Sequence, residues 1–135
     1  MTPAPVRGGA VAADALRLPI FFDTNVLVYA YDPDEPARRQ RALWLIREAM
    51  RESRFVISTQ VMQEFFSMML RRHFLPAPRA LDVLRELAEH PVVPASGGSV
   101  LRAAALQQRS RLSIWDALIV QAALDAGCGT LFTED

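Results

Sequence analysis

Short, continuously apolar segments alternate with longer amphipathic segments along most of this 135-residue chain. Apolar runs of a few residues are typical of strands buried on both faces, whereas apolar residues spaced three and four apart are typical of helices with one buried face. Strands and helices that alternate in this way favour a parallel sheet with right-handed crossovers. The pattern therefore predicts an α/β protein in which helices cover both faces of a short, mainly parallel sheet of about four strands.

The predicted elements begin near Pro19 and continue to the last residues. Residues 1–18 are rich in Ala, Pro and Gly, and we expect a poorly ordered extension there, before a domain at 19–135. Gly127 suits the left-handed position that ends a helix. Strands are predicted at 20–22, 55–57, 92–93 and 130–133, and helices at 26–30, 37–51, from Ser58 or Thr59 to Leu70, 80–88, 99–108 and 113–127.

Composition excludes several functions. All 15 basic residues are arginine and balance 15 acidic residues, so chemistry that depends on lysine, such as a Schiff base or a lysine-containing phosphate loop, is excluded. The neutral balance gives no general argument for nucleic-acid binding. The single cysteine, Cys128, has no partner for an internal disulfide, and no apolar run is long enough for a secretory signal or a membrane span. We therefore expect a cytoplasmic protein that does not insert into membranes.

Four acidic residues lie near the predicted strand ends: Asp23, Glu64, Asp116 and Asp135. Asp23 and Asp135 directly follow strands, and the other two lie in the first turns of helices. Because sites in open parallel sheets form outside the carboxyl ends of the strands, these carboxylates are the candidates for a shared site. Acids that converge there repel one another unless a cation neutralises them, and oxygen ligands suit Mg²⁺ or Mn²⁺.

Each acid also has a structural explanation. Asp23 is able to cap the following helix, and Ser113 with Asp116 fits a capping box. Glu64 is harder to explain in this way, because it falls at the margin of an apolar helix face. The helix that carries Asp116 is apolar nearly all round, which predicts that it is buried and that its acid needs a partner. His73, His90 and Cys128 lack zinc-ligand spacing and are interpreted as structural or solvated.

Three regions combine these acids with characteristic neighbours. They are FDTNVLVYAYD at 22–32, STQVMQEF at 58–65, and WDALIV at 115–120 followed by Gly127 and LFTED at 131–135. In this order and spacing they resemble the acidic motifs of PIN domains, particularly those of VapC-like toxins of bacterial toxin–antitoxin pairs. The resemblance covers the chain from about residue 19 to its end.

The resemblance implies a metal-dependent endoribonuclease on a three-layer α/β/α fold. It implies that Asp23, Glu64, Asp116 and Asp135 form a catalytic quartet, with Asp23 and Asp116 as the ligands of Mg²⁺ or Mn²⁺. Asn25 and Thr133 match polar residues that orient the site. The resemblance further implies an RNA substrate, a homodimer and a VapB-like antitoxin as partner.

Two interpretations stay open at this point. The family usually continues beyond the TED segment with another strand, which this chain, ending at Asp135, is expected to lack. The alternative to a nuclease is therefore a truncated or degenerate PIN-like interaction module, whose acids are caps and whose apolar helix mediates dimerisation. A phosphoryl-accepting receiver domain also gathers acids at strand ends, but it would require a lysine.

Two groups of arginines are candidates for contact with an RNA backbone. Arg38, Arg39 and Arg41 form a basic helix face, and Arg109 and Arg111 precede the last predicted helix. Guanidinium groups bind phosphates bidentately. The competing interpretation is a solvated surface, which is the usual role of an arginine-rich helix face.

Overall fold

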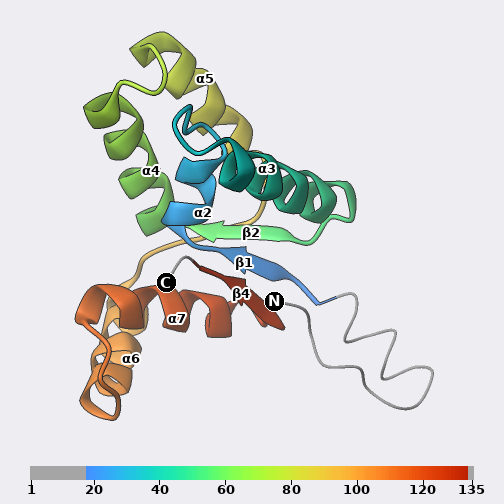
Figure 1. The fold of residues 1–135 in the computed structure, drawn as a ribbon. Helices are drawn as coiled ribbons and strands as arrows, with labels where there is room; N and C mark the ends of the chain where they lie inside the picture. The colour runs from blue at the N-terminus through green and yellow to red at the C-terminus, as the bar shows by residue number, and fades with distance from the viewer. Residues whose placement is uncertain (1–17, 134–135) are drawn as a thin grey trace, which may run out of the picture.

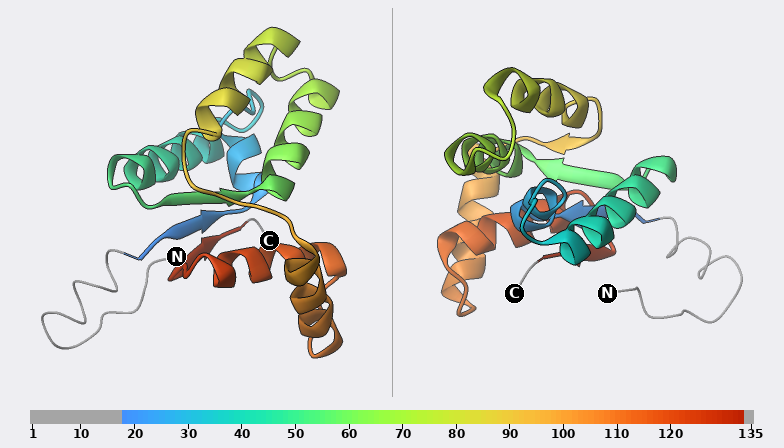
Figure 2. Two further views of the ribbon diagram at one scale, coloured as in Figure 1. Left: turned by 180° about the vertical axis from the view of Figure 1, so that it is seen from behind. Right: turned by 45° about the horizontal axis from the view of Figure 1, so that its top comes forward.

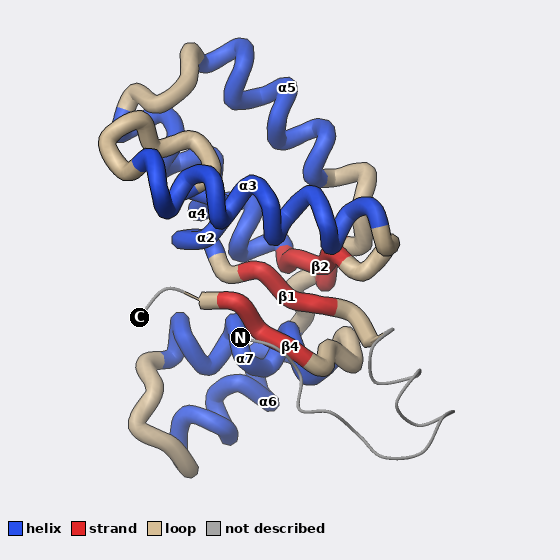
Figure 3. The backbone as a smooth tube through the Cα atoms, turned by 45° about the vertical axis from the view of Figure 1, so that its right-hand side comes forward, coloured by secondary structure: helices blue, strands red, loops and turns tan. Residues whose placement is uncertain are grey.

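A computed structural model describes residues 18–133 and contains a sheet of four parallel strands in the order β3, β2, β1, β4. Figure 3 shows β2, β1 and β4 side by side. The strand bounds are β1 Ile20–Phe22, β2 Phe55–Ser58, β3 Val92–Val93 and β4 Thr130–Phe132. The prediction of a short parallel sheet of about four strands is confirmed.

Helices cover both faces of the sheet, which confirms the three-layer α/β/α arrangement. One face carries α2, α3, α4 and α5, and the opposite face carries α6 and α7 (Figure 1). The two layers of helices are also distinct when the molecule is seen from behind (Figure 2). The helix bounds are α2 Thr24–Tyr29, α3 Pro36–Arg51, α4 Thr59–Arg72, α5 Ala77–Leu87, α6 Gly97–Gln108 and α7 Ile114–Asp125.

The central strand β1 is buried on both sides because it lies between two helical layers. Phe21 and Phe22 have no exposed surface. The ring centroid of Phe22 lies 5.0 Å from that of Phe55 on β2 and 5.4 Å from that of Phe132 on β4. These contacts fix the three adjacent strands, and therefore the positions of the residues that follow them.

Local capping sets several helix ends. The Ser58 hydroxyl accepts a hydrogen bond from the Val61 backbone N–H at 3.2 Å, as the sequence predicts for the start of α4. Gly127 has a φ of +69°, the left-handed conformation predicted for the end of α7. Helix α6 begins at Gly97, earlier than predicted, because Ser96 and Ser99 form a reciprocal capping box around its first turn.

The prediction that the last helix is buried nearly all round is wrong. Trp115 is 64% exposed and Leu124 is 60% exposed, whereas Ala117 and Ile119 are buried. Helix α7 lies in an outer layer, so only its inner face contacts the sheet, and the neighbouring α6 covers a further side (Figure 1). The apolar sequence of α7 therefore leaves large side chains on the surface.

Three predictions concern chain ends or membranes. The extension predicted at 1–18 lies outside the described residues except for its last residue. Asp135 also lies outside them, so its predicted place in the site stays a prediction. Within residues 18–133, no helix is both long and apolar enough to cross a bilayer.

Candidate active site

A cleft with a volume of about 460 Å³ opens beyond the carboxyl ends of β1 and β2. It is lined by the start of α2, one face of α4 and the start of α7, and it contains Asp23, Glu64 and Asp116. The structure thus brings three of the four predicted acids to one cleft. The lining residues are Asp23, Thr24, Asn25, Gln60, Gln63, Glu64, Ser67, Met68, Arg71, Trp115, Asp116 and Ile119.

Asp23 is held by two hydrogen bonds at the end of β1. Its Oδ1 accepts a hydrogen bond from the Thr24 backbone N–H at 2.7 Å. Asp23 therefore caps α2, as the sequence predicts for an aspartate directly before a helix. Its Oδ2 accepts from the Thr133 hydroxyl at 2.8 Å. The resemblance assigned Thr133 an orienting role, and this contact is consistent with it. Each carboxylate oxygen keeps further acceptor capacity for a ligand in the cleft.

Glu64 is oriented by residues from α2 and α4. The Thr24 hydroxyl, which is buried, donates to Glu64 Oε1 at 2.7 Å. The Gln60 side-chain amide donates to Glu64 Oε2 at 3.4 Å and to the Trp115 carbonyl at 3.3 Å. This amide therefore connects the α4 acid to the start of α7. Sequence analysis missed both Thr24 and Gln60.

Asp116 is exposed, which contradicts the prediction that it is buried and needs a partner. It lies in the first turn of α7, which forms part of the cleft wall. Its backbone N–H donates to the Ser113 hydroxyl at 3.1 Å, so the serine caps the helix. Across residues 18–133, its carboxylate forms no hydrogen bond or salt bridge, and it is available to a ligand.

One arginine, Arg71, lines the cleft, and sequence analysis did not single it out. It is exposed and forms no salt bridge with another residue of the described chain. Helical spacing could have identified Arg71 from the sequence. Gln60 lies four residues before Glu64 and Arg71 lies seven residues after it, which places all three on one face of α4. Arg109 and Arg111, the other candidates for contact with an RNA backbone, do not line this cleft.

The donor set of the cleft suits a hard divalent cation. The ionisable ligands it offers are carboxylates, and no histidine or cysteine lines it. In the part of the chain that is described, no group of three or more acidic, histidine or cysteine side chains is close enough to hold a metal ion together. Mg²⁺ usually takes one or two carboxylates and completes its shell with water, so Asp23 and Asp116 suffice as ligands. Their assignment as ligands stays a prediction.

The sequence model of the PIN domain matches residues 20–135, which is most of the chain. No curated protein matches it. PIN domains are generally nucleases, so the match supports hydrolysis of phosphodiester bonds.

Proposed function

The chain belongs to the PIN-domain family, and from this premise we propose that it is a metal-dependent endoribonuclease. The observation that carries the proposal is the convergence of Asp23, Glu64 and Asp116 on one cleft from three separate segments. Capping alone explains the position of Asp23, but it does not explain why an oriented glutamate and an exposed aspartate face the same space.

In this proposal Asp23 and Asp116 hold Mg²⁺ or Mn²⁺. Such a cation lowers the pKa of a bound water and neutralises charge on a scissile phosphate. Thr24 and Gln60 hold the Glu64 carboxylate in a fixed orientation, in which it accepts the proton of the attacking water. Arg71 binds a phosphate of the RNA strand. Asp135, the fourth acid, is included on the resemblance alone.

The test is cleavage of single-stranded RNA with Mg²⁺ or Mn²⁺. Adding a chelator, or replacing Asp23 or Asp116 with Asn, is expected to lower the rate by about a hundredfold or more. Asn caps helices as well as Asp does, so Asp23→Asn keeps the fold, which circular dichroism checks. Asp82→Asn is the matched control, because Asp82 is exposed on α5 outside the cleft. Equal rates in all three variants and the parent would reject the proposal.

We further propose that the nuclease is the toxin of a VapBC-like pair, acts in the cytoplasm as a homodimer, and is silenced by a VapB-like antitoxin. The sequence motifs support the pairing, and the exposed Trp115 and Leu124 support a protein interface on α7. Expression of the parent chain is expected to arrest growth, whereas Asp116→Asn is not. If both proteins arrest growth, toxicity does not depend on RNA cleavage, and the proposal that the nuclease is the toxin is rejected.

The exposed apolar residues of α6 and α7 also favour the second candidate, a non-catalytic interaction module. Leu101 is 73% exposed in addition to Trp115 and Leu124. This candidate predicts a folded oligomer in sedimentation experiments and no metal-dependent cleavage of any RNA. Cleavage that depends on Asp23 and Asp116 would exclude it.

A further inference from the structure

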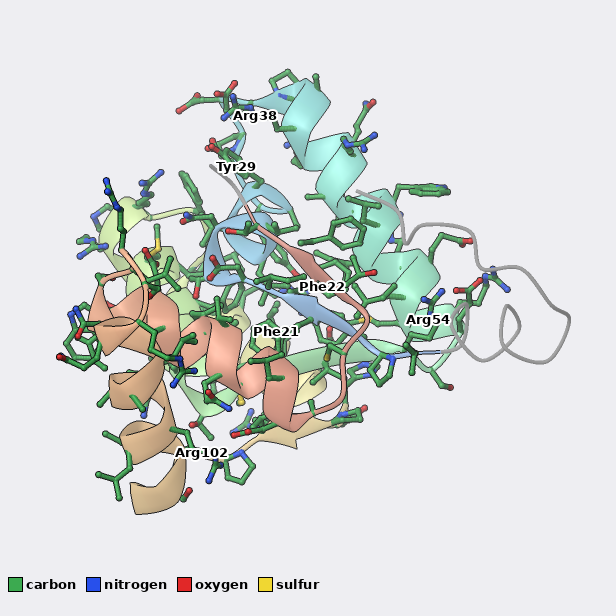
Figure 4. All side chains as sticks on the ribbon, turned by 90° about the horizontal axis from the view of Figure 1, so that it is seen from below. Phe21, Phe22, Tyr29, Arg38, Arg54 and Arg102 are labelled. Atoms are coloured by element: carbon green, nitrogen blue, oxygen red, sulfur yellow. The ribbon has the colours of Figure 1, made fainter. Side chains whose placement is uncertain are left out.

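A second groove, with a volume of about 260 Å³, lies next to the candidate active site. We call it the α2–α3 groove because most of its wall comes from these helices, and the end of β4 supplies the rest. Figure 4 shows Tyr29 and Arg38 beside one another at this end of the molecule. The lining residues are Val26, Tyr29, Arg38, Arg41, Ala42, Leu45, Phe132 and Thr133.

The α2–α3 groove shares a wall with the catalytic cleft. Thr133 lines the groove, and its hydroxyl donates to Oδ2 of Asp23, which lines the cleft. Helix α2 contributes to both cavities, with Thr24 and Asn25 on the cleft and Val26 and Tyr29 on the groove. The two cavities are therefore linked through the contact between Thr133 and Asp23 and through consecutive residues of α2.

The charged side chains among the described residues that line the α2–α3 groove are the two arginines Arg38 and Arg41. Arg38 donates to the Tyr29 hydroxyl at 2.6 Å, and its guanidinium carbon lies 5.1 Å from the centre of that ring. Arg38 also lies 4.0 Å from the Glu35 carboxylate, which offsets part of its charge, so Arg41 is the main cation that the groove offers. Arg41 is exposed and forms no salt bridge with any residue in 18–133. None of the described residues that line the groove is acidic.

The remaining wall of the α2–α3 groove is apolar. Ala42 and Val26 are buried at its base, and Leu45 and Phe132 are partly exposed. A nucleotide carries an anionic phosphate, which a guanidinium binds, and a base whose flat face packs against apolar side chains. The α2–α3 groove offers both kinds of contact side by side. A peptide would use the apolar wall but would leave Arg41 without an anion unless it carried an acid at the same place.

We propose that the α2–α3 groove binds an RNA nucleotide adjacent to the scissile one, with Arg41 on its phosphate and Leu45 and Phe132 against its base or sugar. This inference rests on the proposed function, since it extends the substrate path of the same site. Arg38, stacked on Tyr29, adds positive charge to the phosphate position.

The test compares Arg41→Gln with Arg47→Gln. Both arginines are exposed on α3 and lack salt bridges within the described chain, but Arg47 lines a different cavity, between α3 and α5. The probe is a fluorescently labelled, mixed-sequence single-stranded RNA of about ten nucleotides. Its Kd is measured by anisotropy at several salt concentrations with chelator present, so that no cleavage occurs. Circular dichroism and thermal melting confirm that both variants are folded.

Arg41→Gln is expected to raise Kd about tenfold, because one charge-assisted phosphate contact is lost. The slope of log affinity against log salt should become shallower by about 0.7, the value for one contact to a single strand. Arg47→Gln should stay within about twofold of the parent. If the two variants weaken binding equally, or if the parent does not bind the RNA, the inference is overturned.

A parallel cleavage assay separates this inference from the proposed function. If RNA is bound through Arg41 but is not cut with Mg²⁺ or Mn²⁺, the groove assignment stands and the nuclease proposal fails. If RNA is cut and Arg41→Gln binds it as tightly as the parent does, the nuclease proposal stands and the groove is not part of the RNA path. In that case a partner peptide becomes the occupant to test.

Discussion

Thr24 forms the shorter of the two hydrogen bonds that orient the Glu64 carboxylate. It is 4% exposed, and its hydroxyl reaches Glu64 Oε1 across 40 positions of sequence. Replacing it with Val keeps the shape of the side chain but removes the donor, so the carboxylate is no longer held in one orientation. Thr24 acts through Glu64 and is therefore a positioning residue.

We expect Thr24→Val to lower the rate of RNA cleavage about tenfold, as is typical when a residue that orients a catalytic group is lost. Thr24→Ser keeps the hydroxyl and should retain most of the activity even though it loses a buried methyl group. The measurement is kcat and KM for both variants, with urea unfolding to record stability. If Val and Ser variants cleave at the same rate, the hydrogen bond does not position Glu64.

Cys128 gives a prediction of pH dependence at the residue scale. Burial raises the pKa of its thiol to about 11 from a usual 9.0. A raised pKa means that the thiol stays protonated until the pH approaches 11, and the thiolate is the form that reacts. At about pH 8, alkylation by iodoacetamide should be roughly a hundredfold slower in the native protein than in urea, and it should accelerate as the pH rises. Equal rates in both states would contradict this burial effect.

The candidate site was only partly predictable from individual residues. Asp23, Glu64 and Asp116 were found because the residues after parallel strands meet at one sheet edge. The hydrogen bond from Thr24 to Glu64 was not predicted, because it depends on how α2 packs against α4. Local sequence does not specify that packing. Arg109 and Arg111 precede α7 in the sequence but do not line the cleft, so their contact with an RNA backbone stays a prediction.

At the scale of elements, α7 depends on a glycine for its end. The Gly127 N–H donates to the Leu124 carbonyl at 3.0 Å, and the Cys128 N–H donates to the Ala123 carbonyl at 3.0 Å. A side chain at Gly127 would meet no atom within 4 Å, so a substitution there costs backbone strain rather than a clash.

Gly127→Ala is expected to lower the free energy of unfolding by about 1 kcal/mol, because φ is +69°. Gly97 is the matched control, since it also has open space around it but does not adopt the left-handed conformation. Gly97→Ala should be neutral or stabilise by up to about 1 kcal/mol. Urea unfolding of both variants provides the comparison. Equal destabilisation by the two substitutions would show that conformation at Gly127 is not the cause.

Most element boundaries were predictable because their signals are local. Runs such as Ile20–Phe22 and caps such as Ser58 need no knowledge of distant residues. The exposure of α7 was not predictable in this way. Its sequence is apolar on nearly all sides, and only the arrangement of the layers (Figure 1) determines which of its apolar side chains stay exposed.

At the scale of the whole molecule, the sheet order explains why a single cleft forms. Strands β1 and β2 are adjacent and parallel, so the segments that follow them, Asp23 with α2 and the whole of α4, emerge on one edge. Helix α7 lies in the layer on the opposite face of the sheet (Figure 1), and its first turn contributes Asp116 to the same cleft. The α2–α3 groove is linked to this cleft through Thr133 and Asp23, and in the proposed function the two cavities take parts of one RNA strand.

The central claim is that the carboxylates of this cleft bind a divalent cation together. Calorimetric titration with Mn²⁺ tests it without requiring an RNA target. We expect a saturable isotherm for the parent chain and for Asp82→Asn, and a loss of affinity of about tenfold or more for Asp23→Asn and Asp116→Asn. Identical isotherms for all four proteins, or no binding by the parent, would contradict it.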